Sequence, residues 1–522
     1  MKSKPAPSQV QPLGTPLRRY LYFTAAVTGA AILIVEILGA KMLSPYVGTS
    51  HFVWTAQIAV TLVSLATGYY FGGWLVDRSQ KLGRLYLCIL FAAIYLCFAV
   101  LVCEKVAYAC LQYKLAVGAL LTSMALFFVP LTLLATTGPF LVRVLTGLIT
   151  GVGGLVGRLS AISTLGSVIG TVLIGYALIP FLPNSITMFL TASLLMAIVA
   201  GYFLIWGKKD RPTLTLSIGA LAGLAMGYGG LSNGTARSDA STAELYRGNS
   251  NFGLVQVLEH KNSRRRFYLN DYLIQNTYDP ATKQSTSMFT YMLHSLARAY
   301  NQQINDVLCI GLGIGIVPMR FASEGVKVDV VEINPAVVPV AARFFDLQPD
   351  KLNISIGDGR YFLNQCTNRY DVIILDAFLG DSSPSHLMTK EAFRAMQRVL
   401  RKGGVLVINS FGEFQTGEDF FTASLEKTLK SVFRSVRIHS EGNGNVFFVA
   451  SDEAALKVPG APDLLPMHPF VREQVKLAFN RITQTNPAHG RVLTDDFNPV
   501  EYYDAINREM VRRQLAISMR TF

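Results

Sequence analysis

Long apolar segments fill the first 231 residues of the chain, and shorter alternating segments fill the rest. A helix that crosses a bilayer needs about 20 mostly apolar residues. The segments that meet this length, each expected to span a membrane, are 20–40, 52–76, 85–103, 115–136, 160–182, 185–206 and 213–231. Polar residues 1–19 precede them and are expected to form a flexible tail. Residues 20–231 are therefore predicted to be a polytopic α-helical membrane domain with about seven helices.

Three glycines and one carboxylate stand out in this predicted domain. Gly68, Gly72 and Gly73 allow another helix to approach the second span closely. Glu36 lies inside the first span, where an isolated carboxylate costs a few kcal/mol and should face protein or water. Two interpretations of Glu36 remain open: contact with an ion or amine, and a structural hydrogen bond to a Thr or Ser of a neighbouring helix.

From residue 245 the pattern becomes that of a mixed α/β protein. Strand-like runs at 254–260 and 265–270 with a polar turn between them, followed by a helical pattern at 285–300, predict a small β-hairpin/helix subdomain over 245–300. Strands and helices then alternate to the end of the second domain, 301–522. The strand-like runs are 306–311, 326–333, 352–357, 370–376, 403–410, 432–440 and 445–450. This repetition predicts a Rossmann-like α/β domain with a mostly parallel sheet and helices on both faces.

Glycines and carboxylates follow the first four of these strands. In such folds, ligands bind beyond the carboxyl ends of the strands. The candidate residues there are Gly311, Gly313 and Gly315 after the first strand, Glu332 at the end of the second, Asp358 and Gly359 after the third, and Asp376 after the fourth. Glycines let the backbone approach a ligand, and an acid about 20 residues further on can accept hydrogen bonds from ribose hydroxyls.

The glycine turn favours a nucleoside without a pyrophosphate. It reads GLGIGI, so the last glycine of the dinucleotide fingerprint is missing. S-adenosylmethionine or its decarboxylated form therefore fits these residues better than NAD.

At these residues the chain resembles the spermidine synthase (polyamine aminopropyltransferase) family. The segments that carry the resemblance are LNDYLIQ (269–275), the GLGIG turn, VVEINPAVV, GDGRYFL (357–363) and YDVIILDAF. The preceding helices, the PSHLMT run and TDDFNPVE (494–501) are similar to the membrane-fused branch of that family. The resemblance covers roughly residues 245–450 in the synthase-like part.

The resemblance implies transfer of an aminopropyl group from decarboxylated S-adenosylmethionine to a small amine. It assigns Asp376 as the base and amine anchor, Glu332 to the ribose, Asp358 to the adenine, and Gln275 to the tail of donor or acceptor. Asp271 occupies an aspartate position of the family, where substrate binding and a structural role are equally open. No prosthetic group and no metal are implied.

The chain departs from the family at the acceptor end. Soluble members carry a second Asp three residues after the first, and here that position is Leu379, with Asp381 as a candidate substitute. The family's YHE-type segment aligns with Phe289–Tyr291, so its His and Glu are missing. Replacement carboxylates for the amine are expected from Asp495, Asp496 and Glu501, for which a solvated loop is the alternative. His386 is expected either to line the gate loop or to cap a structural element.

Composition limits the remaining partners. The net charge of +13 comes largely from short loops between apolar segments, and Arg264–Arg266 fits a solvated hairpin, so nucleic acid is not expected. The 6 cysteines show no CxxC or metal-ligand spacing and are expected to be buried thiols. The expected partners are the lipid bilayer, a small amine and, as in soluble family members, further copies of the chain.

Two other functions remain open. A methyltransferase that uses S-adenosylmethionine would share the fold. The two functions differ in the tail of the donor that the pocket must bind. A carboxylate-rich pocket suits the decarboxylated donor, and a basic or backbone-donor pocket suits a methionine carboxylate. The third possibility is a transporter-like protein with a nucleoside-sensing domain, supported by Glu36 and by the loop Gly72–Arg84, which resembles a loop of major facilitator transporters.

The expected location is the cell (inner) membrane, with several crossings. Lys and Arg on the tail and on every second loop place the N-terminus inside. Seven full crossings would place the second domain outside, although its co-substrate is cytosolic. We predict a cytoplasmic second domain, which requires that 213–231 does not cross fully or that a span between 138 and 182 is miscounted; an external domain is the alternative.

Overall fold

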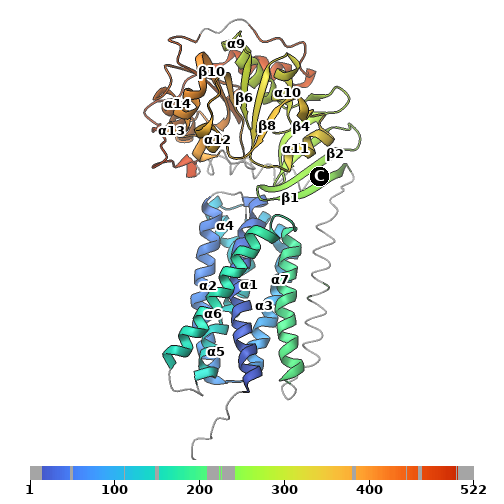
Figure 1. The fold of residues 1–522 in the computed structure, drawn as a ribbon, viewed down its shortest axis with the longest axis vertical. Helices are drawn as coiled ribbons and strands as arrows, with labels where there is room; N and C mark the ends of the chain where they lie inside the picture. The colour runs from blue at the N-terminus through green and yellow to red at the C-terminus, as the bar shows by residue number, and fades with distance from the viewer. Residues whose placement is uncertain are drawn as a thin grey trace, which may run out of the picture. The chain divides into compact units, whose positions relative to one another are not determined.

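The protein is described here from a computed structural model. The structure describes residues 14–47, 51–110, 112–146, 152–207, 223, 225, 241–378, 384–442, 444–456, 461–500, 502 and 503. The chain divides into a helical unit that extends to residue 236 and an α/β unit that begins at residue 237 (Figure 1). Each is described by itself.

Six long apolar helices are found in the described part of the helical unit. They are α1 (Thr15–Val47), α2 (His51–Arg78), α3 (Leu82–Cys110), α4 (Leu115–Ala135) continued by α5 (Thr137–Thr146), α6 (Val152–Leu173) continued by a π-helical turn (Ile174–Leu178), and α7 (Asn184–Ile205). All are long and apolar enough to cross a membrane. The predicted span 213–231 lies outside the described residues except for Gly223 and Ala225, so the number of crossings stays a prediction.

Small residues let these helices approach closely. A side chain at Gly68 would collide with the carbonyl oxygen of Thr132, and one at Gly72 would lie 2.7 Å from the carbonyl oxygen of Thr136. Two of the three predicted glycines therefore pack α2 against the α4–α5 segment, whereas Gly73 has open space around its Cα.

The α/β unit begins with an antiparallel sheet. Its strands are β1 (Thr242–Ser250), β2 (Gly253–His260), β3 (Arg266–Asn270), β4 (Leu273–Asp279) and β5 (Gln284–Ser285), paired in sequence order. The predicted hairpin corresponds to β2 and β3. Glu259 binds both Arg264 and Arg266, which explains the arginine cluster as ion pairing in this hairpin.

An eight-stranded sheet forms the larger part. Its order is β13-β11-β12-β10-β9-β6-β7-β8. The strands β10 (Leu400–Gly412), β9 (Tyr370–Leu375), β6 (Asp306–Ile310), β7 (Lys327–Glu332) and β8 (Asn353–Ile356) are parallel. The strands β12 (Gly444–Ser451), β11 (Ser435–Ser440) and β13 (Ile482–Thr483) add an antiparallel edge. The predicted mostly parallel sheet is therefore observed.

Helices connect and cover these strands. They are α9 (Met288–Tyr300), α10 (Ile316–Ser323), α11 (Val337–Phe344), α12 (Gly359–Gln365), α13 (Lys390–Val399), α14 (Phe420–Lys430) and α15 (Arg472–Asn480), with 3-10 turns at Pro349–Lys351, Ser385–Leu387 and Pro469–Val471.

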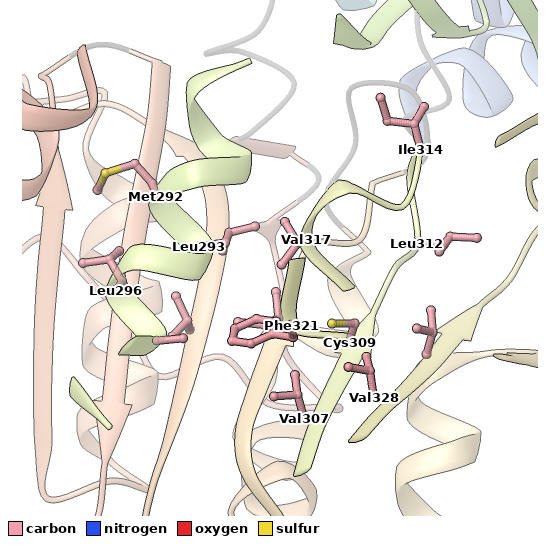
Figure 2. Packing of buried hydrophobic residues seen from close by; sticks show 14 of the residues in the cluster. Met292, Leu293, Leu296, Val307, Cys309, Leu312, Ile314, Val317, Phe321 and Val328 are labelled. Atoms are coloured by element: carbon pink, nitrogen blue, oxygen red, sulfur yellow. The ribbon is translucent and has the colours of Figure 1, made fainter. Parts of the chain in front are cut away.

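Side chains along the central strands point alternately to the two faces of the sheet and form two apolar cores, one on each face. Val307 and Cys309 of β6 belong to one apolar cluster, and Leu308 and Ile310 belong to the other. Figure 2 shows the first cluster, in which side chains of α9 and α10, including Phe321, lie beside β6. Because both faces are covered, β6 and β9 hold their carboxyl ends in fixed positions.

Candidate active site

The candidate site lies where the order of the parallel strands reverses. From β6 the chain proceeds outward to β7 and β8, and then returns to β9 on the other side of β6. The turn after β6 and the turn after β9 therefore diverge from neighbouring strands, which leaves a crevice between them. Gly311 begins the first turn and Asp376 begins the second.

A backbone contact between these two turns requires glycine. Gly311 has φ of +100°, and a Cβ there would collide with the carbonyl oxygen of Asp376. The amide of Asp376 donates a hydrogen bond of 3.0 Å to the carbonyl of Ile310. The first glycine of the motif thus sets the distance between the two strand ends.

The other two glycines shape the entry to α10. Gly313 has φ of +53° and open space around its Cα, and it lines the cavity described below. Gly315 has φ of +84° at the N-terminus of α10, and a Cβ there would lie 2.5 Å from Leu347. It lines a second cavity, on the other side of the turn.

A cavity of about 820 Å³ opens at the crevice, a volume within the range of small-molecule sites. Most of the predicted donor-binding residues line it: Gln275, Gly311, Gly313, Glu332, Asp358, Gly359 and Asp376. Residues from four strand ends, from β4 and from α9 thus meet in one site.

Glu332 is fixed by backbone amides at the base of the cavity. The amides of Leu312 and Asn334 donate to its two carboxylate oxygens, at 2.9 Å and 2.8 Å. Burial raises the pKa of this carboxyl, and these hydrogen bonds oppose the rise. Each oxygen keeps lone-pair capacity for a further donor, such as a ribose hydroxyl.

Asp358 caps α12 and contacts the wall of the cavity. Its Oδ1 accepts from the amide of Tyr361 at 2.9 Å, and its Oδ2 lies 2.7 Å from Nε2 of His386. Burial would raise the pKa of Asp358, but the Tyr361 amide and the His386 ring outweigh it and hold the pKa below its usual value. His386 therefore lines the cavity and pairs with a carboxylate, and it does not cap the 3-10 turn in which it lies.

Asp376 is a buried carboxylate with altered acidity. Burial raises its pKa from 3.8 to about 6, and a hydrogen bond from Asn409 opposes the rise. Nδ2 of Asn409 donates to Oδ1 of Asp376 at 2.8 Å, and Nδ2 of Asn445 donates to Oδ1 of Asn409 at 2.8 Å. This chain of amides orients the carboxylate, and a pKa near neutrality suits a group that accepts and releases a proton.

Two further carboxylates in the cavity escaped the sequence analysis. Glu413 and Glu418 follow β10 and line the cavity. Burial and the negative charge of Glu418 raise the pKa of Glu413. Their position after the fifth strand was a usable signal, but only the ends of the first four strands were considered. Among the described residues that line the cavity there is no Lys or Arg.

Known proteins resemble this part of the chain. A model of the spermine/spermidine synthase domain matches residues 286–440. Residues 286–440 form a spermine/spermidine synthase domain. The predicted family resemblance and the predicted fold class are thereby confirmed: a synthase domain with a methyltransferase-like fold follows a region of long apolar helices.

Two of the curated relatives belong to different transferase classes. A polyamine aminopropyltransferase of Vibrio vulnificus is 29% identical over 233 residues, which are 42% of this chain and 77% of that protein. An N-terminal histidine N-methyltransferase of Emericella nidulans is 28% identical over 253 residues, 44% of each chain. The match thus spans less than half of the fungal protein. A solved spermidine synthase of Thermotoga maritima is 18% identical, with a TM-score of 0.36, over 45% of this chain and 88% of that one.

Some predicted site residues do not line the cavity of the synthase domain. Asp271 and Tyr272, with φ of 47° and 63°, form the tight turn between β3 and β4. The Oδ1 of Asp271 accepts from the amide of Leu254, which ties this turn to β2. Asp381 and Glu501 lie outside the described residues.

Asp495 holds the wall of the cavity instead of lining it. Its carboxylate accepts from Thr389 at 2.6 Å and from Arg360 at 3.1 Å. Asn498 donates to the carbonyl of Ser385 at 2.7 Å. The segment 493–498 thus fastens the segment 385–390, which includes His386. Asp496, exposed in the same segment, does not line the cavity either.

The segment that replaces the family's YHE residues still reaches the cavity. Phe289 and Thr290 line it, and the hydroxyl of Tyr291 donates to the carbonyl of Ser285 at 2.8 Å. The described part of α9 contributes no carboxylate to the lining of the cavity, whereas the segment after β10 contributes Glu413 and Glu418.

Substitution of Gly311 by Ala should destabilise the synthase domain, because a Cβ would push the turns of β6 and β9 apart. We expect the thermal transition of the full-length protein in detergent to fall by several degrees, since backbone clashes of this kind cost about 1–3 kcal/mol or more. Gly313→Ala is the matched control: it occupies open space and should cost only about 1–2 kcal/mol. Equal stability of Gly311→Ala and the parent would contradict the proposed contact.

Proposed function

We propose that the chain transfers an aminopropyl group from decarboxylated S-adenosylmethionine to a small amine. One observation carries the proposal: Asp376, with a pKa of about 6, lies at the strand switch point in a cavity whose described lining contains several carboxylates and no Lys or Arg. The donor's sulfonium and its tail ammonium are cationic, as is the acceptor amine at pH 7. An acidic cavity suits all three groups and does not suit the carboxylate of a methionine tail.

Different residues of the cavity would bind the donor and the acceptor. Glu332 would accept hydrogen bonds from the ribose, Asp358 from the adenine amino group, and Gln275 would contact the aminopropyl tail. For adenine to bind Asp358, the amino group would share or replace the His386 contact at Oδ2. Glu413 and Glu418 would hold the distal charge of the acceptor.

The reaction is a direct displacement at carbon. The acceptor ammonium, bound beside Asp376, first gives up a proton to that carboxylate, which frees the nitrogen lone pair. The neutral amine then attacks the carbon next to sulfur, and the product is a secondary ammonium. The carbon–sulfur bond breaks, its electron pair stays on sulfur, and methylthioadenosine leaves. Positioning and the local negative charge supply the rate enhancement, because the sulfonium already provides a good leaving group.

A methyltransferase is the second candidate, and the Emericella nidulans relative is the observation that favours it. Donor and product distinguish the two functions. Methyl transfer would consume S-adenosylmethionine and release S-adenosylhomocysteine.

Purified full-length protein should release methylthioadenosine from decarboxylated S-adenosylmethionine in the presence of an amine panel. Asp376→Asn should lower kcat by about 10²–10⁴-fold, the usual contribution of a positioned base. Chromatography of the nucleoside products is the measurement.

Donor binding by Asp376→Asn controls for folding, since Glu332 and Asp358 are unchanged and methylthioadenosine should still bind. Release of S-adenosylhomocysteine from S-adenosylmethionine, with no turnover of the decarboxylated donor, would refute the aminopropyltransferase and support the methyltransferase.

The rate should depend on the ionisation of Asp376. The base works only as a carboxylate, so kcat/KM should fall as pH drops through about 6, the raised pKa. Asn409 stabilises the ionised form, and Asn409→Leu should therefore move this acidic limb upward by about one pH unit, since a hydrogen bond to a charged group contributes ~1.5 kcal/mol or more. An acidic limb at the same pH in both proteins would contradict the assignment.

We further propose that the six apolar helices anchor the enzyme in the cell membrane, with the synthase domain on the cytoplasmic side. Length and composition of the helices support the anchoring, and the Lys and Arg pattern supports a cytoplasmic N-terminus. Because the proposed co-substrate is cytosolic, the synthase domain must also lie on the cytoplasmic side. Self-association, expected from soluble family members, is part of this proposal.

Labelling of Gln484→Cys, an exposed position of the synthase domain, tests the orientation. A membrane-impermeant thiol reagent should label it only after the cells are permeabilised. The parent protein is the control, because its cysteines in the described residues are buried or half-buried. Labelling in intact cells would place the domain outside and refute the cytoplasmic assignment.

A further inference from the structure

Polar side chains gather where α1 and α2 face each other. The hydroxyl of Thr61 on α2 donates to the backbone carbonyl of Gln57 at 2.9 Å and lies close to the carboxylate of Glu36 on α1. One turn along, a Cβ at Gly39 would lie 2.8 Å from Nε2 of Gln57. Glu36 and Gly39 share one face of α1, and Gln57 and Thr61 share one face of α2. The two pairs therefore form one small polar cluster between the helices.

Thr61 lies near Glu36, as one of the two interpretations of Glu36 expects, but its hydroxyl is bonded to the backbone and does not pair with the side chain of Gln57. This side chain is fully buried, and within the described residues neither its amide oxygen nor its amide nitrogen has a hydrogen-bond partner. Leaving such groups unpaired costs about 1–3 kcal/mol each. Leu or Met would fill this space without that cost. The buried amide is therefore evidence for a ligand that pairs with it.

The missing side chain at position 39 makes the cluster possible. With glycine there, the end of Gln57 lies against the backbone of α1 at Gly39, three residues after Glu36. Three kinds of oxygen are then available together: a carboxylate from Glu36, an amide carbonyl from Gln57 and a hydroxyl from Thr61.

We propose that Glu36, Gln57 and Thr61 bind a monovalent cation between α1 and α2. A single carboxylate matches a single positive charge, and in the described residues there is no group of three or more acidic, His or Cys side chains that would hold a divalent metal. Oxygen acceptors suit both an alkali ion and a primary ammonium, which has three donors to offer. An ionisable group among membrane-spanning helices commonly marks such a site.

This site lies in the helical unit and does not depend on the chemistry of the synthase domain. It gives the helices a ligand of their own, in addition to anchoring. The cation is either an alkali ion, for which sodium is the probe, or the ammonium group of an amine such as the proposed acceptor, and the experiment separates these two sources.

Equilibrium binding of radiolabelled sodium and of radiolabelled putrescine to the full-length protein in detergent tests the proposal. Glu36→Gln and Gln57→Leu should each weaken binding of one of these cations at least tenfold. Gln57→Glu, which keeps the shape and adds a negative charge, should bind it more tightly than the parent. Thr67→Ala is the matched control, because Thr67 is on α2 but exposed, and it should bind like the parent.

Loss of sodium binding alone would identify an alkali-ion site, and loss of putrescine binding, with sodium as a weak competitor, would identify an ammonium site. If Glu36→Gln does not fold, weaker binding by Gln57→Leu together with tighter binding by Gln57→Glu supports the proposal. Binding that is unchanged in all three variants, or absent in the parent, overturns the proposal. Turnover by the synthase domain in Glu36→Gln is measured in parallel and should be retained, so failure of this site and failure of the proposed reaction are distinguishable.

Discussion

The close approach of two backbone turns, one after β6 and one after β9, is the constraint on which the catalytic half of the molecule depends. At Gly311 the chain reaches the carbonyl of Asp376 with no room for a side chain. The contact brings the acid that would receive a proton next to the turn that would receive the nucleoside. The two apolar cores on either side of the sheet hold the strands that carry these turns. The packing of the domain therefore also fixes the geometry of the site.

Charge in the cavity follows from the same arrangement. Parallel strands deliver their carboxyl ends to one edge, and an acid at each of several ends produces a negative site without any dedicated loop. Burial then raises the pKa of Asp376, while Asn409 keeps its carboxylate oriented. Glu332 and Asp358 are held by backbone amides, which leaves them acceptors for hydroxyl or amino groups.

Much of this could be read from the sequence, because strand ends, glycine turns and long apolar helices leave periodic signals. The positions of Glu332, Asp358 and Asp376 followed from the strand pattern alone. The acids of the acceptor end did not, since Asp495 pairs with Arg360 and Thr389 instead of lining the cavity, and these two contacts link residues more than a hundred positions apart. Asp271 carried a family motif, yet its left-handed turn and its bond to Leu254 are tertiary facts that no local pattern encodes. The unpaired amide of Gln57 also needed coordinates, because only the fold brings it against Gly39.

The fastening of segment 385–390 by segment 493–498 has a consequence for biosynthesis. A ribosome makes the donor-binding turns, from Gly311 to Asp376, long before it makes Asp495 and Asn498. During that interval the nascent domain can form its sheet but lacks the contacts that hold His386 in place. The wall of the cavity that carries His386 is therefore completed only after the last of these residues has left the exit tunnel.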